Sequence, residues 1–171
     1  YNYPRDKPCG GGVFVSAAAQ LPFSLNPVVE RVTDGFRVTY RRGQPFGHRF
    51  DSPLAYMTQR ALLDAFLVER ACASGVQFQD GRKVDGSALN EDRATVQIDN
   101  GERLCARTIV AADGANGVVR RFLGFPPFRQ AIALEANIDG VQPHWFDQVG
   151  LDLGSMPGGY GWVFPKGDHL N

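Results

Sequence analysis

The spacing of apolar residues changes along this chain, and that change constrains the fold more than any other feature. Between positions 54 and 73, five apolar residues are separated by 7, 4, 3 and 4 positions: Leu54, Ala61, Ala65, Val68 and Cys72. Such spacing places them on one face of an α-helix. Asp51 or Ser52 can cap the start of this helix, and Gly75 can end it. We therefore expect a helix over Leu54–Ala73, between stretches that alternate with the period of β-strands.

The stretches on either side of this helix have the pattern of antiparallel sheet. Residues 28–50 hold two or three strands with a turn at Asp34-Gly35, and residues 130–165 hold three more. Asn100-Gly101 lies between alternating segments and predicts a hairpin. The unbroken apolar segment Thr108–Ala112 is typical of a strand that is covered on both faces. The remaining short elements are expected as strands over 13–18, 76–79, 83–89, 94–99 and 102–106, and as a helical segment over 117–123.

Composition excludes several classes of protein. The 171 residues suit one ordinary domain, and 18 basic side chains balance 18 acidic ones, so no net charge attracts nucleic acid. Three scattered cysteines offer neither a disulfide framework nor metal-ligand spacing, which favours a reducing compartment. Membrane-spanning and signal-peptide patterns are absent, so we expect a cytoplasmic protein, with a peripheral membrane contact left open. The chain starts without Met, and we interpret it as a fragment.

The segment Ile109–Arg121 combines an apolar strand, an Asp113-Gly114 turn and the start of a helix. Glycine lets backbone approach a ligand, and the N–H groups of a helix start favour anionic oxygens. A phosphate or ribityl contact and a plain joint capped by Asp113 are equally good interpretations of these residues. The segment resembles the second flavin motif of the two-domain flavoproteins related to para-hydroxybenzoate hydroxylase, in which the Asp-Gly pair faces bound FAD. Gly117 stands where that family usually has Ser.

The start of the predicted helix carries a second resemblance to these flavoproteins. Arg60 and Asp64 occupy the positions of an Arg that reaches the FAD diphosphate and an Asp that supports the helix. An Arg in the first helical turn interacts unfavourably with the positive end of the helix dipole unless an anion compensates its charge. By themselves, the two residues fit a surface arginine or an i,i+4 ion pair better. Together with the Asp-Gly motif, the resemblance implies that Arg60, Asp113 and Gly114 contact FAD.

Two further motifs resemble the geranylgeranyl reductase branch of these FAD-dependent oxidoreductases, which saturates double bonds of isoprenoid chains. They are PRDKPCGGGV at Pro4–Val13 and PGGYGWVFPKGD at Pro157–Asp168. In that branch the Cys-Gly-Gly loop lies against the flavin ring, and the aromatic strand lines the substrate cavity. The resemblance therefore implies that Gly10, Gly11 and Gly12 contact the cofactor.

The aromatic strand can be interpreted in two ways. Tyr160, Trp162 and Phe164 alternate, so they fall on one face of a strand and form an aromatic wall suited to a long apolar chain. An aromatic core stripe is the plainer interpretation, whereas the resemblance favours the lined cavity. A cysteine such as Cys9 is more commonly a packing residue than a reagent. Tyr160 and Cys9 are nevertheless the two candidates for the proton donor.

The resemblance covers only the middle of the family's length and implies a divided α+β fold. We predict a flavin-facing loop and linker over 1–27, substrate-domain strands over 28–53, part of an FAD-binding α/β domain over 54–125, and antiparallel substrate-domain sheet over 126–171. A dinucleotide fingerprint G-x-G-x-x-G is absent from the sequence. We therefore expect the isolated fragment to be inactive.

The reaction implied by the resemblance is hydride transfer from reduced FAD to a geranylgeranyl-type double bond, with NAD(P)H or another reductant as electron donor. The expected partner is an isoprenoid or another apolar small molecule, with no metal. Two alternatives stay open. One is a flavin-dependent hydroxylase or halogenase on the same scaffold, and a halogenase is expected to place a lysine in the substrate channel. The other is a non-catalytic lipid-binding module without flavin.

Overall fold

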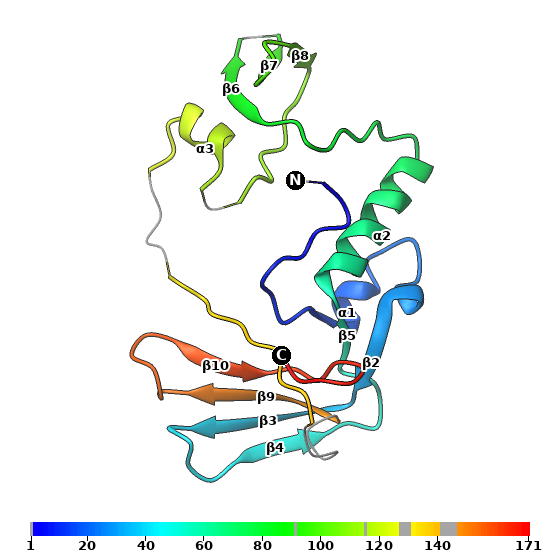
Figure 1. Ribbon diagram of the computed structural model, residues 1–171, viewed down its shortest axis with the longest axis vertical. Helices are drawn as coiled ribbons and strands as arrows, with labels where there is room; N and C mark the ends of the chain where they lie inside the picture. Colours follow the sequence, from blue (N-terminus) through cyan, green and yellow to red (C-terminus); the bar gives the residue numbers. More distant parts are fainter. Residues whose placement is uncertain (1, 91, 115, 127–130, 141–146) are drawn as a thin grey trace. The chain divides into compact units, whose positions relative to one another are not determined.

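The computed structural model describes residues 2–90, 92–114, 116–126, 131–140 and 147–171. They form two compact units (Figure 1). The larger unit comprises Tyr3–Gln77 and Leu134–Asn171, and the smaller unit comprises Phe78–Ala133 with the first two residues. Both units combine helix with antiparallel sheet, which confirms the predicted α+β class.

A three-stranded antiparallel sheet in the order β1-β5-β2 forms one part of the larger unit. Its strands are β1 (Gly12–Phe14), β5 (Ala55–Thr58) and β2 (Val29–Thr33). The same part contains three helical segments: α1 (Val15–Ala18), the 3-10 turn η1 (Asn26–Val28) and α2 (Arg60–Ala73). Leu63 of α2 is buried against Leu25 and Val28, and this cluster fixes the helix to the segment before β2.

A four-stranded sheet in the order β10-β9-β3-β4 forms the other part of the larger unit (Figure 1). Its strands are β10 (Tyr160–Val163), β9 (Gln148–Leu153), β3 (Gly35–Tyr40) and β4 (Phe46–Arg49). The outer pairs are antiparallel, whereas β3 and β9 run parallel to each other. Two segments that are distant in sequence therefore make one continuous sheet.

The two sheets of the larger unit share a core. Ala55 and Met57 of β5 are buried together with Val149 of β9, and Phe36 and Phe164 pack around them. Met57 has no exposed surface at all. This cluster holds the four-stranded sheet against the strand that leads into α2.

The smaller unit is a β-meander with one short helix. Its strands, in the order β6-β7-β8, are β6 (Val84–Leu89), β7 (Ala94–Ile98) and β8 (Arg103–Ala106), and its helix is α3 (Val118–Phe122). Ala94, Ile98 and Val119 are its buried apolar side chains among the described residues. The predicted hairpin at Asn100-Gly101 is confirmed, and Gly101 has the positive φ (+85°) that such a turn requires.

The predicted start of the long helix is wrong. Ala55–Thr58 is strand β5, and α2 begins at Arg60. Ala55, Met57 and Thr58 of β5 are buried and Tyr56 is partly buried, so apolar residues need not alternate along this strand. The run from Leu54 onward could therefore continue the helical spacing without being helical.

Several other predicted elements also differ from the structure. Asp34-Gly35 joins β2 and β3, but these strands belong to different sheets and form no hairpin. The strand predicted over 13–18 ends at Phe14, where α1 takes over. Segments 76–79, Thr108–Ala112 and 131–137 carry no strand, because none of the three sheets in the described residues pairs with them. Val110 is 85% exposed, so the expected cover on both faces of Thr108–Ala112 is absent as well. Residue 130 lies outside the described residues.

Within the described ranges, no helix has the length and apolar character that crossing a bilayer requires. No group of three metal-ligating side chains is found in them either.

Candidate functional site

The loop Cys9–Gly12 lies directly against the end of the aromatic strand. Gly10 is buried, and a Cβ atom there would lie 2.4 Å from Phe164 Cδ2 and 3.1 Å from Trp162 Nε1. The first distance is far below a van der Waals contact, so only glycine permits this approach. The structure therefore brings together the two motifs on which the closer resemblance rests.

The other two glycines of the loop also make room for protein atoms. Gly11 has a φ of +62°, and a Cβ there would lie 2.1 Å from the carbonyl oxygen of Thr58. A Cβ at Gly12 would lie 3.3 Å from Met57 Cε. From the sequence we explained these glycines by the close approach of a ligand, but protein atoms stand on the side where a Cβ would point. Their contact with a cofactor stays a prediction.

The aromatic residues belong to a wider apolar face of the four-stranded sheet. Tyr160 and Trp162 share one face of β10, and their ring centroids are 6.1 Å apart. The register continues this face across the sheet, because Trp162 pairs with Leu151, Leu151 with Val38 and Val38 with Phe46. Tyr160 and Phe46 are 54% and 68% exposed, so much of this face is open. We call these five residues the apolar wall.

The three predicted wall residues differ in burial. Phe164 lies beyond the end of β10 and packs on the shared core. Trp162 is half-buried, and its Nε1 donates a hydrogen bond of 2.9 Å to Asn171 Oδ1. Tyr160 is the exposed member. Phe164 is thus a core residue by its packing, whereas Tyr160 presents its ring to open space.

Asp64 binds two arginines near the start of α2. Arg60 Nε and one of its terminal nitrogens donate to the two carboxylate oxygens, each at 2.8 Å, and Arg5 donates to Oδ2 at 3.2 Å. The hydrogen bonds to Asp64 raise the pKa of Arg60 further, and a hydrogen bond with Cys9 adds to this. The i,i+4 pair that the sequence suggested is therefore present. Arg5 was missed, because its position in a loop 59 residues before Asp64 gives no local signal.

Lys166 is a second residue that the sequence analysis did not identify. It is 3% exposed, and its Nζ donates to the carbonyl oxygens of Gly10 at 2.6 Å and Thr58 at 2.5 Å. Burial lowers its pKa, and the negative charge of Glu30 acts in the opposite direction. In the sequence, Lys166 stands in a polar Pro-Lys-Gly-Asp run that is typical of an exposed turn.

The Asp113-Gly114 turn belongs to the smaller unit. Asp113 Oδ2 accepts a hydrogen bond of 3.1 Å from Val119 N, so Asp113 caps α3. A Cβ at Gly117 would lie 2.1 Å from Asp113 Oδ1, which explains why the usual Ser is absent here. Gly114 has a φ of +85°, and a Cβ there would meet nothing within 4 Å. The joint is therefore capped as the plainer interpretation requires, and its glycine borders open space.

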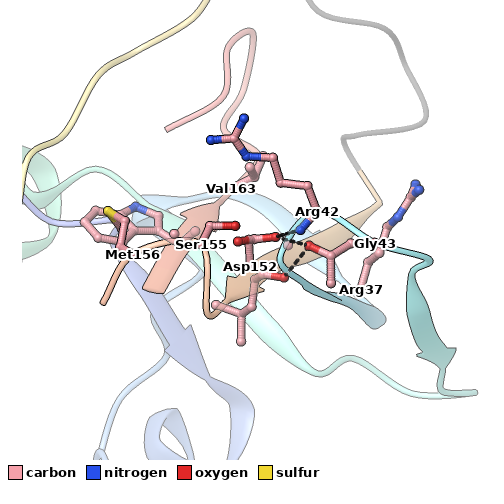
Figure 2. A pocket seen from close by; sticks show the side chains of 12 residues that line it. Arg37, Arg42, Gly43, Asp152, Ser155, Met156 and Val163 are labelled. Carbon is pink, nitrogen blue, oxygen red and sulfur yellow. Dashed lines mark hydrogen bonds between the residues drawn. The ribbon is translucent and has the colours of Figure 1, made fainter. Parts of the chain in front are cut away.

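A cavity of about 480 Å³ lies along the four-stranded sheet, and Leu151 and Trp162 of the apolar wall are among its lining residues. Figure 2 shows the side chains that line it. Arg37, Thr39 and Asp152 line it and alternate along their strands with residues of the apolar wall. Hydrogen bonds from Ser155, Thr39 and the backbone N–H of Arg42 lower the pKa of Asp152. Of the lining residues, the sequence analysis named Trp162 but not Arg37, Thr39 or Asp152.

Comparison with known proteins gives one family match. A family model described as FAD binding domain matches residues 30–147. Among curated relatives, the chain is 26% identical to a geranylgeranyl diphosphate reductase of Oryza sativa subsp. japonica, over 96% of the chain and 40% of that protein. It is 29% identical to digeranylgeranylglycerophospholipid reductase 1 of Methanopyrus kandleri, over 73% of the chain and 36% of that protein. The chain thus spans less than half the length of these relatives.

Solved structures show the same fold. Among them is a geranylgeranyl bacteriochlorophyll reductase-like protein from Thermoplasma acidophilum, with a TM-score of 0.75 and 22% sequence identity. The match covers 95% of this chain and 44% of that one.

Proposed function

Since this chain belongs to the FAD binding domain family, we propose that it supplies part of the FAD site and of the substrate cavity of an enzyme that reduces isoprenoid double bonds. The expected flavoprotein family and its cofactor, FAD, are confirmed by the family match and by the relatives named reductases. The isoprenoid substrate, the electron donor and the reaction belong to the proposal. Bound FAD in its reduced form would supply the hydride.

One observation carries this proposal: an open apolar wall adjoins the Cys-Gly-Gly loop. Gly10 packs on Trp162, and from Trp162 the wall extends over four strands to Phe46. An unactivated alkene offers no polar group to bind, so a protein that reduces it must position the chain by apolar contact and exclude water. A wide aromatic and aliphatic surface beside the loop suits that task.

The described residues fit FAD. Arg60 is held by Asp64 with its guanidinium in a fixed plane, and an arginine suits a diphosphate. Asp113 is fixed by its bond to Val119 N, and Gly114 leaves open space at the turn. In the proposed enzyme Arg60 binds the diphosphate, and Asp113 and Gly114 contact the ribityl chain.

Two groups, one on the apolar wall and one in the loop, could deliver the proton that the reduced double bond requires. Tyr160 exposes its ring on the wall, and Cys9 is half-buried at the start of the loop. Both have a transferable hydrogen on the side chain. We propose one of them as the proton donor, and the variants Tyr160→Phe and Cys9→Ser distinguish them by which one lowers turnover with little change in substrate binding.

The halogenase alternative requires a lysine in the substrate channel. The chain has three lysines, and Lys166 is the one beside the aromatic strand. Its Nζ is engaged by two carbonyl oxygens and is buried. This arrangement favours the reductase over the halogenase.

The test uses the whole protein, loaded with FAD and supplied with a chemical reductant and a geranylgeranyl lipid. Mass spectrometry of the lipid should show the gain of hydrogen at its double bonds. Trp162→Ala should lower turnover about tenfold or more, whereas Phe125→Ala, an exposed aromatic residue outside the wall, should leave it unchanged. A flavin-loaded protein that binds no isoprenoid lipid would contradict the proposed substrate. A protein that binds the lipid but never FAD would be the lipid-binding module instead.

A further inference from the structure

We propose that Lys166 is a positioning residue that sets the conformation of the Cys9–Gly12 loop. Its ammonium holds the peptide between Gly10 and Gly11 with the carbonyl turned inward. This inference rests on the proposed function in one respect, because the loop is proposed to face the flavin. The effect of Lys166 on the loop itself can be measured without that assumption.

The contacts of Lys166 join three segments of the larger unit. Its Nζ donates to Gly10 in the loop and to Thr58 at the end of β5. Its own carbonyl oxygen accepts a hydrogen bond of 2.8 Å from Arg31 Nε in β2. Lys166 therefore connects the segment after the aromatic strand to the loop, to the strand before α2 and to the edge of the same sheet.

Burial of an ammonium group is energetically unfavourable unless its N–H donors form hydrogen bonds. Transfer of a charge from water to the protein interior is unfavourable, and burial accordingly lowers the pKa of Lys166. Within the described ranges no carboxylate forms an ion pair with it, although Glu30 and Glu135 act on it from farther away. A methionine would fill a similar volume without this cost. The two carbonyl contacts are therefore what a lysine provides at this position.

Those contacts determine which way the loop peptide faces. The carbonyl and N–H of a trans peptide point in opposite directions. Because the Gly10 carbonyl points at Lys166, the Gly11 N–H is turned away from it. The structure shows no backbone acceptor for that N–H in the part of the chain that it describes. The loop thus presents a donor on the side opposite Lys166.

The next peptide of the loop is fixed from the same side. Thr58 N and Oγ1 both donate to the Gly11 carbonyl, at 2.9 and 2.8 Å. A Cβ on Gly11 would lie 2.7 Å from Lys166 Nζ as well as 2.1 Å from Thr58 O. Gly11, Thr58 and Lys166 therefore pack as one interlocked group, and a change in any one of them should release the loop.

The experiment compares Lys166→Met with Lys83→Met, an exposed lysine, in the whole flavin-loaded protein. Amide hydrogen exchange should become about tenfold faster in residues 9–13 of Lys166→Met, with β9 unchanged. The visible absorption and circular dichroism of the bound flavin should also shift. Lys166→Arg keeps the charge and two or more donors, and it should restore part of both signals.

The outcomes test the role of Lys166 separately from the proposed function. If residues 9–13 exchange at the same rate in Lys166→Met as in Lys83→Met, the proposed role of Lys166 is wrong. It is also wrong if exchange in Lys166→Met accelerates equally in the loop and in β9, because that indicates general destabilisation. Faster loop exchange with an unchanged flavin spectrum would support the role of Lys166 and contradict a flavin-facing loop. If Lys166→Met does not fold, Gly11→Ala replaces it, with Gly75→Ala as control. Both glycines have positive φ, but a Cβ at Gly75 meets nothing within 4 Å.

Discussion

Replacing Asp64 by Asn removes the negative charge that Arg5 and Arg60 share. The carboxylate accepts two hydrogen bonds from Arg60 at 2.8 Å and one from Arg5 at 3.2 Å. Its side chain is 11% exposed, and those of the arginines are 19–20% exposed. Water can therefore replace only part of the hydrogen bonding that Arg5 and Arg60 lose.

The expected loss follows from these contacts. A hydrogen bond between charged groups contributes about 1.5–3 kcal/mol. Asn keeps one acceptor oxygen, but its amide group places N–H against a guanidinium N–H. Partial exposure of the arginines reduces the penalty. We therefore expect Asp64→Asn to lower the free energy of unfolding of the larger unit by about 2–3 kcal/mol.

Urea unfolding followed by tryptophan fluorescence measures this loss, because Trp162 is half-buried in β10 of the larger unit. Glu69→Gln is the matched control, since it removes the same charge from an exposed position of α2. Glu69→Gln should change stability by less than about 0.5 kcal/mol. If Asp64→Asn costs no more than Glu69→Gln, the arginine pair does not stabilise this unit and the reasoning fails.

Three further predictions use the same unfolding measurement. Gly10→Ala should cost about 1–3 kcal/mol, because its Cβ would lie 2.4 Å from Phe164 Cδ2, and an unchanged midpoint would contradict the close approach. Met57→Ala, at a fully buried position, should cost about 2–5 kcal/mol, whereas the exposed Met156→Ala should have little effect; equal costs would refute the assigned core. The pKa of Lys166 is lowered, so between that pKa and 10.5 the unfolded chain binds a proton that the folded chain lacks. Stability of the wild type relative to Lys166→Met should therefore rise with pH in this window, and a constant difference would argue against the lowered pKa.

Local patterns predicted those parts of the fold that depend on neighbouring residues. The Asn100-Gly101 turn needs only a short sequence, and it forms the β7–β8 hairpin as expected. The end of α2 at Ala73 follows from the same kind of local signal. Strand β5 was missed because it joins α2 through Gln59 alone and its burial depends on β1 and β2. Whether Asp34-Gly35 makes a hairpin also depends on distant strands.

The candidate site likewise contains residues that the sequence indicated and residues that it did not. The resemblance assigned the Cys-Gly-Gly loop to the flavin and the aromatic strand to the substrate, and their contacts with these ligands stay predictions. In the structure, Gly10 packs on Trp162. The resemblance could not indicate that a Cβ on the loop glycines would strike protein atoms. Lys166 and Arg5 escaped notice because each acts through a contact with a distant segment, and a charged residue in a polar run predicts exposure.

The parallel pairing of β3 with β9 bears on how the chain acquires its structure. Thr39 and Asp152, which face each other in this pair, are 113 residues apart in sequence, whereas the meander β6-β7-β8 closes over a short stretch. During synthesis the meander and the β3–β4 pair can form before β9 is made, so β3 waits with one unpaired edge. High contact order slows folding and prolongs the exposure of such edges to aggregation. Expression at lower temperature or with a chaperone should therefore raise the soluble yield of this chain.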